Sequence, residues 1–424
     1  MSPARRRIWD GTQWLPSAGG STPTVAELKT ARNQLTPGRL NGGVWTPGDY
    51  VPGNAYTENS VGVYEGTVFT EVEANTTETG AGMPNRISLP AGNYENTRFW
   101  GEILLSGTGT WRFTNCVFAG MRPDVIENMG RGLNGATPAQ RGVLRNYNTS
   151  RFVEFIDCTL DGKLWYDVRG VEADVYAKRL WNANPRLGGD SVDQPGTVAS
   201  WQSPSSIGIS GCNITMRRCE VTNFQDLLVL IGDNWDVTDS WIHKCWWGCR
   251  GVGGSSDYYT HSDPVQTHNG KNWRFVNNFI GGLLNTDGFN WDIPGNIGYN
   301  AGDGGDTSGG VLIQQETTSD PQSPQWISGV TVVGNVMAGG RANANIHYAR
   351  GNALTDMIFT DNLFLKRPTT APRNDNGAQI FISDEIRDGG ATVVRNYEVD
   401  WEQLFGAWPN GGNGNTNIYS RNTT

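Results

Sequence analysis

The sequence lacks any long run of apolar residues and has few charged ones. No stretch approaches the roughly 18 consecutive apolar residues of a membrane-spanning helix, so we expect no membrane insertion. The arginines of MSPARRRIWDG precede no apolar segment, which predicts that there is no secretory signal. Leu-rich helical stretches are scarce, which argues against an all-α fold. Only 18% of residues are charged and the net charge is −9, whereas general nucleic-acid binders are normally basic, so no nucleic-acid partner is expected.

Glycine and tryptophan are abundant instead. The chain has 56 Gly and 17 Trp among 424 residues, and 37% of its residues are hydrophobic, too many for a disordered protein. A length of 424 residues ordinarily predicts two or three compact domains. A solenoid is the alternative, because it grows along one axis and each repeat packs only against its neighbours.

One ten-residue phrase recurs along the chain. It reads WRFTNCVFAG from Trp111, VEFIDCTLDG from Val153, ITMRRCEVTN from Ile214, WDVTDSWIHK from Trp235, WRFVNNFIGG from Trp273, VTVVGNVMAG from Val330, MIFTDNLFLK from Met357 and, more weakly, ATVVRNYEVD from Ala391. In each copy, apolar and polar residues alternate, a pair of polar residues follows, and a second short stretch of alternating residues completes the phrase. Period-two alternation predicts two half-buried strands, and the polar pair predicts a bend between them.

The sixth residue of every phrase is a thiol or a small polar residue. These residues are Cys116, Cys158, Cys219, Ser240, Asn278, Asn335, Asn362 and Asn396. Their spacings are 42, 61, 21, 38, 57, 27 and 34 residues. We interpret 21 as one coil of a three-stranded β-helix, 42 as two coils, and the irregular gaps as missed coils or inserted loops. Stacked side chains at this position would form a ladder along the axis, with the cysteines as interior packing residues.

A further strand precedes many phrases, as in SIGISGCN, LLVLIGDN and DPVQTHNGKN. Three short strands per coil predict an all-β fold, a right-handed parallel β-helix. We place it at residues 46–400, with insertions near 121–150 and 163–203. Residues 1–45 differ in pattern: Asp-Gly between Trp9 and Trp14 predicts a hairpin, and a capping box from Thr24 predicts a short helix. Residues 401–424 form a C-terminal cap and a loose tail.

Two resemblances follow from these patterns. RRRIWDGTQWLP resembles the start of minor tail proteins from phages of actinobacteria. The coil resembles the pectate-lyase-like β-helix of phage tailspikes and of polysaccharide lyases and hydrolases, over roughly residues 90–400. The resemblance implies a tail protein, commonly a homotrimer, that faces carbohydrate. Fold alone does not fix function, because only some of these proteins cut sugars.

The densest polar cluster is YYTHSDPVQTHNGKNW. HSDPVQ resembles a phrase of β-helix proteins that bind or act on polysaccharides. Alternation predicts that Val265 and Thr267 face inward while Gln266 and His268 face outward. The next coils offer DGFNWD, VLIQQE, NIHYAR and QIFISDE. The predicted ligand-binding residues are His261, Asp263, Gln266, His268, Asn290, Trp291, Asp292, Gln314, Glu316, His347, Tyr348 and Arg350.

Catalysis is an open alternative at the same place. Two carboxylates could act as acid and base in glycoside hydrolysis, and a base beside a cation would serve a lyase. The candidates are Asp263, Asp292, Glu316, His347 and Arg350. No pair of acids stands out, so binding without cutting is the leading interpretation.

No cofactor is predicted, although weak calcium binding by the loop from Asp303 is an alternative. Three interpretations are open for the segment HKCWWGC, which contains His243, Cys245 and Cys249. They are a zinc site, a disulfide between the two cysteines, or packing beside Trp246 and Trp247. We predict no metal there.

The leading hypothesis is a minor tail protein of the virion that binds host cell-surface polysaccharide. Residues 1–45 would attach it to other tail proteins, and cell lysis would release it from the host cytoplasm in which it is made. A tail-borne depolymerase and a purely structural tail component are the alternatives. Residues 1–45 should pack apart from the coil, and their deletion should leave a folded coil that no longer joins the virion.

Overall fold

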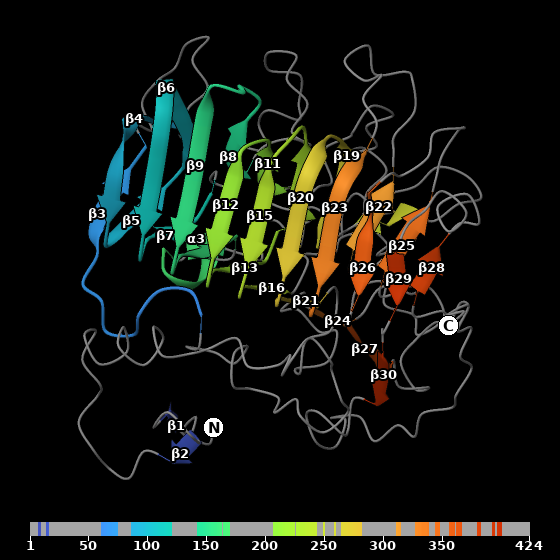
Figure 1. Ribbon diagram of the computed structural model, residues 1–424. Coiled ribbons are helices and arrows are strands. Elements are labelled where there is room, and N and C mark those ends of the chain that lie inside the picture. Colours follow the sequence, from blue (N-terminus) through green and yellow to red (C-terminus); the bar gives the residue numbers. More distant parts are fainter. Residues whose placement is uncertain are drawn as a thin grey trace, which may run out of the picture.

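The computed structural model shows a solenoid of short parallel strands (Figure 1). It describes residues 7–9, 14–16, 61–74, 86–120, 142–162, 164–169, 207–224, 226–243, 249–250, 258–259, 264–281, 311–314, 327–338, 344–347, 356–360, 362–366, 380–382, 392–394 and 397–400. In this part of the chain no helix is long and apolar enough to cross a membrane.

Successive coils place their strands on three faces. Face 1 contains β8 (Gly142–Asn146), β11 (Ile207–Gly211), β14 (Asp226–Ile231), β19 (Val265–Asn269), β22 (Val311–Gln314), β25 (Ala344–His347) and β28 (Ile380–Ile382). Face 2 contains β9 (Arg151–Ile156), β12 (Ile214–Arg217), β15 (Trp235–Thr238), β20 (Lys271–Val276), β23 (Ser328–Val333), β26 (Ile358–Thr360) and β29 (Thr392–Val394).

Face 3 is a separate ten-stranded sheet. It contains β3 (Thr70–Glu73), β5 (Thr97–Trp100), β7 (Val117–Phe118), β10 (Thr159–Asp161), β13 (Glu220–Thr222), β16 (Trp241–His243), β21 (Phe279–Gly281), β24 (Val336–Ala338), β27 (Leu363–Lys366) and β30 (Tyr397–Asp400). Two long strands, β4 (Arg86–Glu95) and β6 (Glu102–Thr114), run across faces 1 and 2, and β6 pairs with both β8 and β9. The fold is the predicted right-handed parallel β-helix.

Three smaller elements lie outside these faces. β1 (Arg7–Trp9) and β2 (Trp14–Pro16) form an antiparallel hairpin, as predicted, with Trp9 paired with Trp14. β17 (Cys249–Arg250) pairs antiparallel with β18 (Tyr258–Tyr259) between two coils. The four-residue helix α3 (Leu164–Asp167) starts the second predicted insertion. The predicted helix from Thr24 and the tail 401–424 lie outside the described residues.

The interpretation of the 42-residue spacing as two coils was wrong. β7, which follows Cys116, pairs directly with β10, which follows Cys158, and the Thr159 N–H donates to the Cys116 carbonyl at 3.0 Å. The 61-residue gap to Cys219 also joins neighbouring coils, because β10 pairs with β13. Both gaps are therefore one coil with an inserted segment. Only the parallel pairing, which brings equivalent strands within hydrogen-bonding distance, reveals this.

The predicted ladder at the sixth phrase position is confirmed from Cys116 to Asn362. The backbone N–H of Cys219 donates to Ser240 Oγ at 3.1 Å, and the N–H of Ser240 donates to Asn278 Oδ1 at 2.9 Å. The chain of bonds continues through Asn335, whose own N–H donates to Asn362 Oδ1 at 3.0 Å. Every side chain in this run is buried. Asn396 lies outside the described residues.

Wherever the structure describes it, the residue before a ladder position turns the chain between faces 2 and 3. Asn115, Asp157, Asp239 and Asn277 have φ between 52° and 63°. Asn and Asp adopt this left-handed conformation at lower cost than other residues with a side chain, which explains the recurring polar pair of the phrase. Arg218 occupies the same corner with φ 52°. Its guanidinium donates two hydrogen bonds to Asp157, at 2.7 and 3.0 Å.

Residues 61–67 cross these corners from outside. The N–H of Tyr64 donates to Asn115 Oδ1 at 2.8 Å, and its hydroxyl donates to Asp157 Oδ2 at 2.7 Å. The N–H of Gly62 donates to the Arg218 carbonyl. This segment therefore closes over the coil and does not add a strand to it, although it lies within residues 46–400, which were assigned above to the β-helix.

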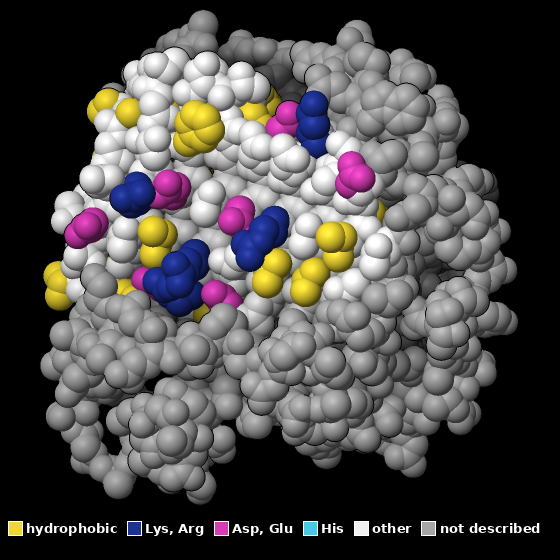
Figure 2. All heavy atoms as spheres, in the orientation of Figure 1, with side chains coloured by type: hydrophobic (Ala, Val, Ile, Leu, Met, Phe, Trp, Pro, Cys, Tyr) yellow, Lys and Arg dark blue, Asp and Glu magenta, His cyan; other side chains and the backbone are white. Residues whose placement is uncertain are grey.

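Face 2 carries ion pairs between adjacent strands. Arg112 lies 2.5 Å from Glu154, and Arg274 lies 2.6 Å from Asp236, in each case on adjacent strands. Figure 2 shows Lys or Arg side chains next to Asp or Glu side chains on this side of the molecule. Exposed pairs of this kind add little stability, so they mainly keep the face polar.

The ladder thiols should be unreactive in the native protein. Cys116, Cys158 and Cys219 are fully buried, and burial raises the pKa of the Cys158 thiol well above its ordinary value. A thiol must be reached by a disulfide reagent and must ionise to react with it; burial shields all three thiols, and the raised pKa of Cys158 also keeps that thiol neutral at pH 8. We expect these three cysteines to stay unlabelled in native protein and to label fully in denaturant, as measured by peptide mapping. Labelling of Cys158 within minutes under native conditions would contradict the ladder.

Candidate functional site

Three strands of face 1 carry the described part of the predicted polar cluster. β19, β22 and β25 are consecutive and parallel. Gln266 is paired with Leu312, and Gln314 is paired directly with His347. Neighbouring strands lie about 4.8 Å apart, so these backbone positions lie within the length of one sugar.

The alternation of β19 agrees with the sequence where its side chains are described. Val265 and Thr267 are buried, at 0% and 1% exposure, and Gln266 between them is half-buried. This places Gln266 on the outward side. The backbone of His268 lies in the same strand, next to a register shift between β14 and β19.

Most of the other predicted residues fall beyond what the structure describes. His261, Asp263, Asn290, Trp291, Asp292, Glu316, Tyr348 and Arg350 lie outside the described residues. Their place on the same face stays a prediction, and so does every catalytic role assigned to them.

The HKCWWGC segment is described only at its ends. The imidazole of His243 lies 2.9 Å from Glu220 Oε1 and stacks on the Trp241 ring, with the centroids 3.6 Å apart. Cys249 is in β17, whereas Cys245, Trp246 and Trp247 lie outside the described residues, as does the loop from Asp303. No group of three metal-binding side chains occurs among the residues that are described.

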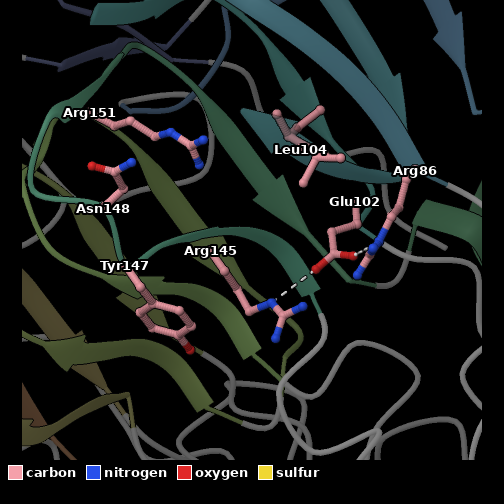
Figure 3. A pocket seen from close by; sticks show the side chains of 8 residues that line it. Arg86, Glu102, Leu104, Arg145, Tyr147, Asn148 and Arg151 are labelled. Carbon is pink, nitrogen blue, oxygen red and sulfur yellow. Dashed lines mark hydrogen bonds and ion pairs between the residues drawn. The ribbon is translucent and has the colours of Figure 1, made fainter. Parts of the chain in front are cut away.

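A cavity that sequence reasoning missed opens at the other end of face 1. It measures about 380 Å³ and lies between β4, β6 and β8 (Figure 3). Small-molecule sites commonly start near this size. Its lining comprises Arg86, Glu102, Ile103, Leu104, Arg145, Tyr147, Asn148 and Arg151.

Glu102 organises the charged side of this cavity. Its carboxylate is only 4% exposed, and it accepts hydrogen bonds from Arg86 Nε at 2.7 Å and from Arg145 Nε at 3.1 Å. Each oxygen thus binds a different arginine, from a different strand. A buried carboxylate needs such partners, because an unpaired buried charge is costly.

Asparagines shape the loop that forms the opposite wall. Asn146 Nδ2 donates to the carbonyls of Arg151 and Cys212, at 3.0 and 2.8 Å. Asn148 Oδ1 accepts from the N–H of Ser150 at 2.9 Å, an Asx turn. The sequence NYNTS thereby folds back tightly from β8 to β9 and brings Tyr147 and Arg151 to the cavity.

Two apolar groups lie open beside the arginines. Leu104 is 46% exposed and Tyr147 is 49% exposed. The Tyr147 hydroxyl is 3.1 Å from Ser210 Oγ, and Arg151 Nε donates to the Gly107 carbonyl at 2.7 Å. These contacts fix the ring and the guanidinium at the rim.

One row of residues, paired in register on successive strands of face 1, runs from the cavity to the predicted polar cluster. Arg145 is paired with Ser210, Ser210 with Val229, and Val229 with Gln266. Three strand spacings separate Arg145 from Gln266, or about 14 Å. Ser210 and Val229 are buried, so the two areas are separate at the surface.

Comparison with known proteins gives one structural likeness. No protein-family model and no curated protein sequence matches this chain. Its structure is similar to a tailspike protein of the Acinetobacter baumannii bacteriophage Fri1, described as a capsular polysaccharide depolymerase, at 10% identity and a TM-score of 0.24. The match covers 74% of this chain and 56% of the tailspike, so the chain spans just over half of that protein's length.

Proposed function

We propose that this chain is a bacteriophage tail protein whose face 1 binds glycan on the surface of the host cell. The observation that carries the proposal is the shared row on face 1. Along the backbone, it joins a cavity that has an exposed tyrosine and half-buried arginines to the strands that bear Gln266, Gln314 and His347.

The chemistry of this face suits sugars. Amide and guanidinium groups donate to hydroxyl and ring oxygens, and an exposed tyrosine ring offers a flat apolar surface. Because parallel strands repeat at about 4.8 Å, a solenoid face presents such groups at regular intervals on a rigid support. A rigid support lowers the entropy lost when a flexible chain binds.

The proposal extends to assembly. Residues 1–45, which contain the hairpin of β1 and β2, attach the chain to other tail proteins, and the complete protein is a homotrimer in the virion. Its sequence resemblance to minor tail proteins supports this arrangement. Such a protein is made in the host cytoplasm and leaves the cell by lysis.

Binding is tested with polysaccharide extracted from actinobacterial cell walls. We expect measurable affinity, and we expect Gln266→Ala to weaken it by about 1 kcal/mol, the value of one hydrogen bond. Thr215→Ala, an exposed position on face 2, is the control and should leave affinity unchanged. Isothermal titration with the purified full chain measures the affinity of the unaltered protein and the change caused by each substitution. Absence of binding to every such extract would refute the proposal.

The same incubation distinguishes binding from cutting. Hydrolysis creates new reducing ends, and lyase chemistry creates unsaturated ends. In the cavity, the only carboxylate among the described lining residues is Glu102, and both of its oxygens accept from arginine. A carboxylate held in this way positions neighbouring groups, so we propose a binding role for the cavity.

A further inference from the structure

We infer that the cavity between β4, β6 and β8 binds the oxyanion of an acidic sugar unit, a carboxylate or a phosphate. The inference rests on the proposed glycan binding and assigns the charge class of the ligand at this place. The cavity is a surface separate from Gln266, so oxyanion binding in the cavity and glycan binding at Gln266 can be tested independently.

Local charge is the first reason. Arg86, Arg145 and Arg151 line the cavity with Glu102, so three positive charges meet one negative charge, and the balance is +2 (3 − 1). The chain as a whole carries −9. A positive cavity in an acidic protein attracts anions, and a neutral sugar would gain nothing from the surplus.

The orientation of the guanidinium groups is the second reason. Arg86 and Arg145 both bind Glu102 through Nε, and their side chains are 23% and 22% exposed. Among the described residues, no hydrogen bond engages the terminal nitrogens of either arginine. Figure 3 shows the two groups on either side of the carboxylate. A guanidinium held through Nε keeps its terminal N–H donors available for two oxygens of a carboxylate or a phosphate.

The apolar wall is the third reason. A free inorganic anion needs only donors, whereas this cavity also exposes Leu104 and the ring of Tyr147. Figure 3 shows the Tyr147 ring beside the Arg145 side chain. A sugar ring can pack on such a surface while its acidic substituent meets the arginines.

Three probes of equal length test the inference: a glucuronic acid oligosaccharide, an oligosaccharide of phosphate-linked glucose units and a neutral glucose oligosaccharide. We expect at least one acidic probe to bind more tightly than the neutral one and to lose affinity as salt rises. Arg145→Lys keeps the charge but loses the planar donor pair, and Arg151→Gln removes a charge at the rim. Each should weaken acidic binding roughly tenfold, the effect of one charge-assisted hydrogen bond.

Arg274→Gln is the matched control for Arg151→Gln. It makes the same charge change on face 2, where Arg274 pairs with Asp236. It should leave all affinities unchanged, and circular dichroism should report the same fold for every variant. Which acidic probe responds to the cavity variants identifies the oxyanion. Competition by inorganic phosphate at the affinity of the sugar would mean a site for free anions and would overturn the inference.

Two further outcomes separate this inference from the proposed function. If cell-wall polysaccharide binds and Gln266→Ala weakens it, but Arg145→Lys and Arg151→Gln do not affect any probe, the inference fails and glycan binding stands. If no extract and no probe binds, the proposed function itself fails.

Discussion

Asn335→Ala is expected to lower the free energy of unfolding by roughly 3–5 kcal/mol, because it leaves several buried polar groups unpaired at once. The Asn335 amide oxygen accepts from the N–H and from Nδ2 of Asn278, at 2.8 and 3.0 Å. Its amide nitrogen donates to the carbonyl of Phe275 at 2.9 Å and to Asn362 Oδ1 at 3.1 Å. Each buried polar group that is left without a hydrogen-bond partner lowers the stability by about 1–3 kcal/mol.

Chemical denaturation followed by circular dichroism measures this loss. Thr331→Ala, a half-buried position in β23, the strand that precedes Asn335, is the control and should cost under about 0.5 kcal/mol. Asn335→Ser should recover part of the stability, because Ser240 already fills a ladder position and its hydroxyl accepts from the Cys219 N–H. Equal losses for Asn335→Ala and Thr331→Ala would show that the ladder bonds contribute nothing.

Trp235→Ala should destabilise the coil by about 3–5 kcal/mol. Trp235 is 1% exposed, is paired in register with Trp273 on the next coil, and donates its indole N–H to the Gly211 carbonyl at 2.6 Å. Trp111 and Trp273 make the same bond to the carbonyls of Leu89 and Gly232. Truncation therefore creates a large cavity and leaves a buried carbonyl without its donor.

A graded series separates these two effects. Trp235→Phe keeps most of the apolar volume and loses the hydrogen bond, so it should cost about 1–2 kcal/mol. Phe152→Ala removes an aromatic ring that is 49% exposed on face 2 and should change stability little. If Trp235→Ala were no worse than Phe152→Ala, the indole would not be part of the core.

The repeating parts of the fold could be predicted from the sequence because each coil obeys the same local rule. Phe155 and Met216 are buried and Thr215 is exposed, as period-two alternation requires. The polar pair marked the corner correctly, since Asp157 and Asn277 are its left-handed residues. The same alternation placed Val265 and Thr267 inside the coil.

The number of coils and the cavity could not be predicted from this local alternation. The number of coils between Cys116 and Cys158 depends on which strands pair, and an insertion leaves no periodic signal. The cavity joins Arg86, Glu102 and Arg145 from three strands, and their contact depends on register. One signal was present: EILLSGTG and GVLRNYN precede their phrases as SIGISGCN precedes Ile214. Aligning all three would have placed Glu102 and Arg145 on face 1.

The direct pairing of β7 with β10, and of β10 with β13, bears on how such a chain diversifies over generations. Cys158 and Cys219 are 61 residues apart, Cys219 and Ser240 only 21, yet both pairs occupy adjacent coils. Segments between coils can therefore lengthen, shorten or be exchanged while the axial rise of about 4.8 Å stays fixed. Under the proposed function, host range is then free to vary through the inserts, whereas the spacing of contacts along a bound polymer changes only when an entire coil is gained or lost.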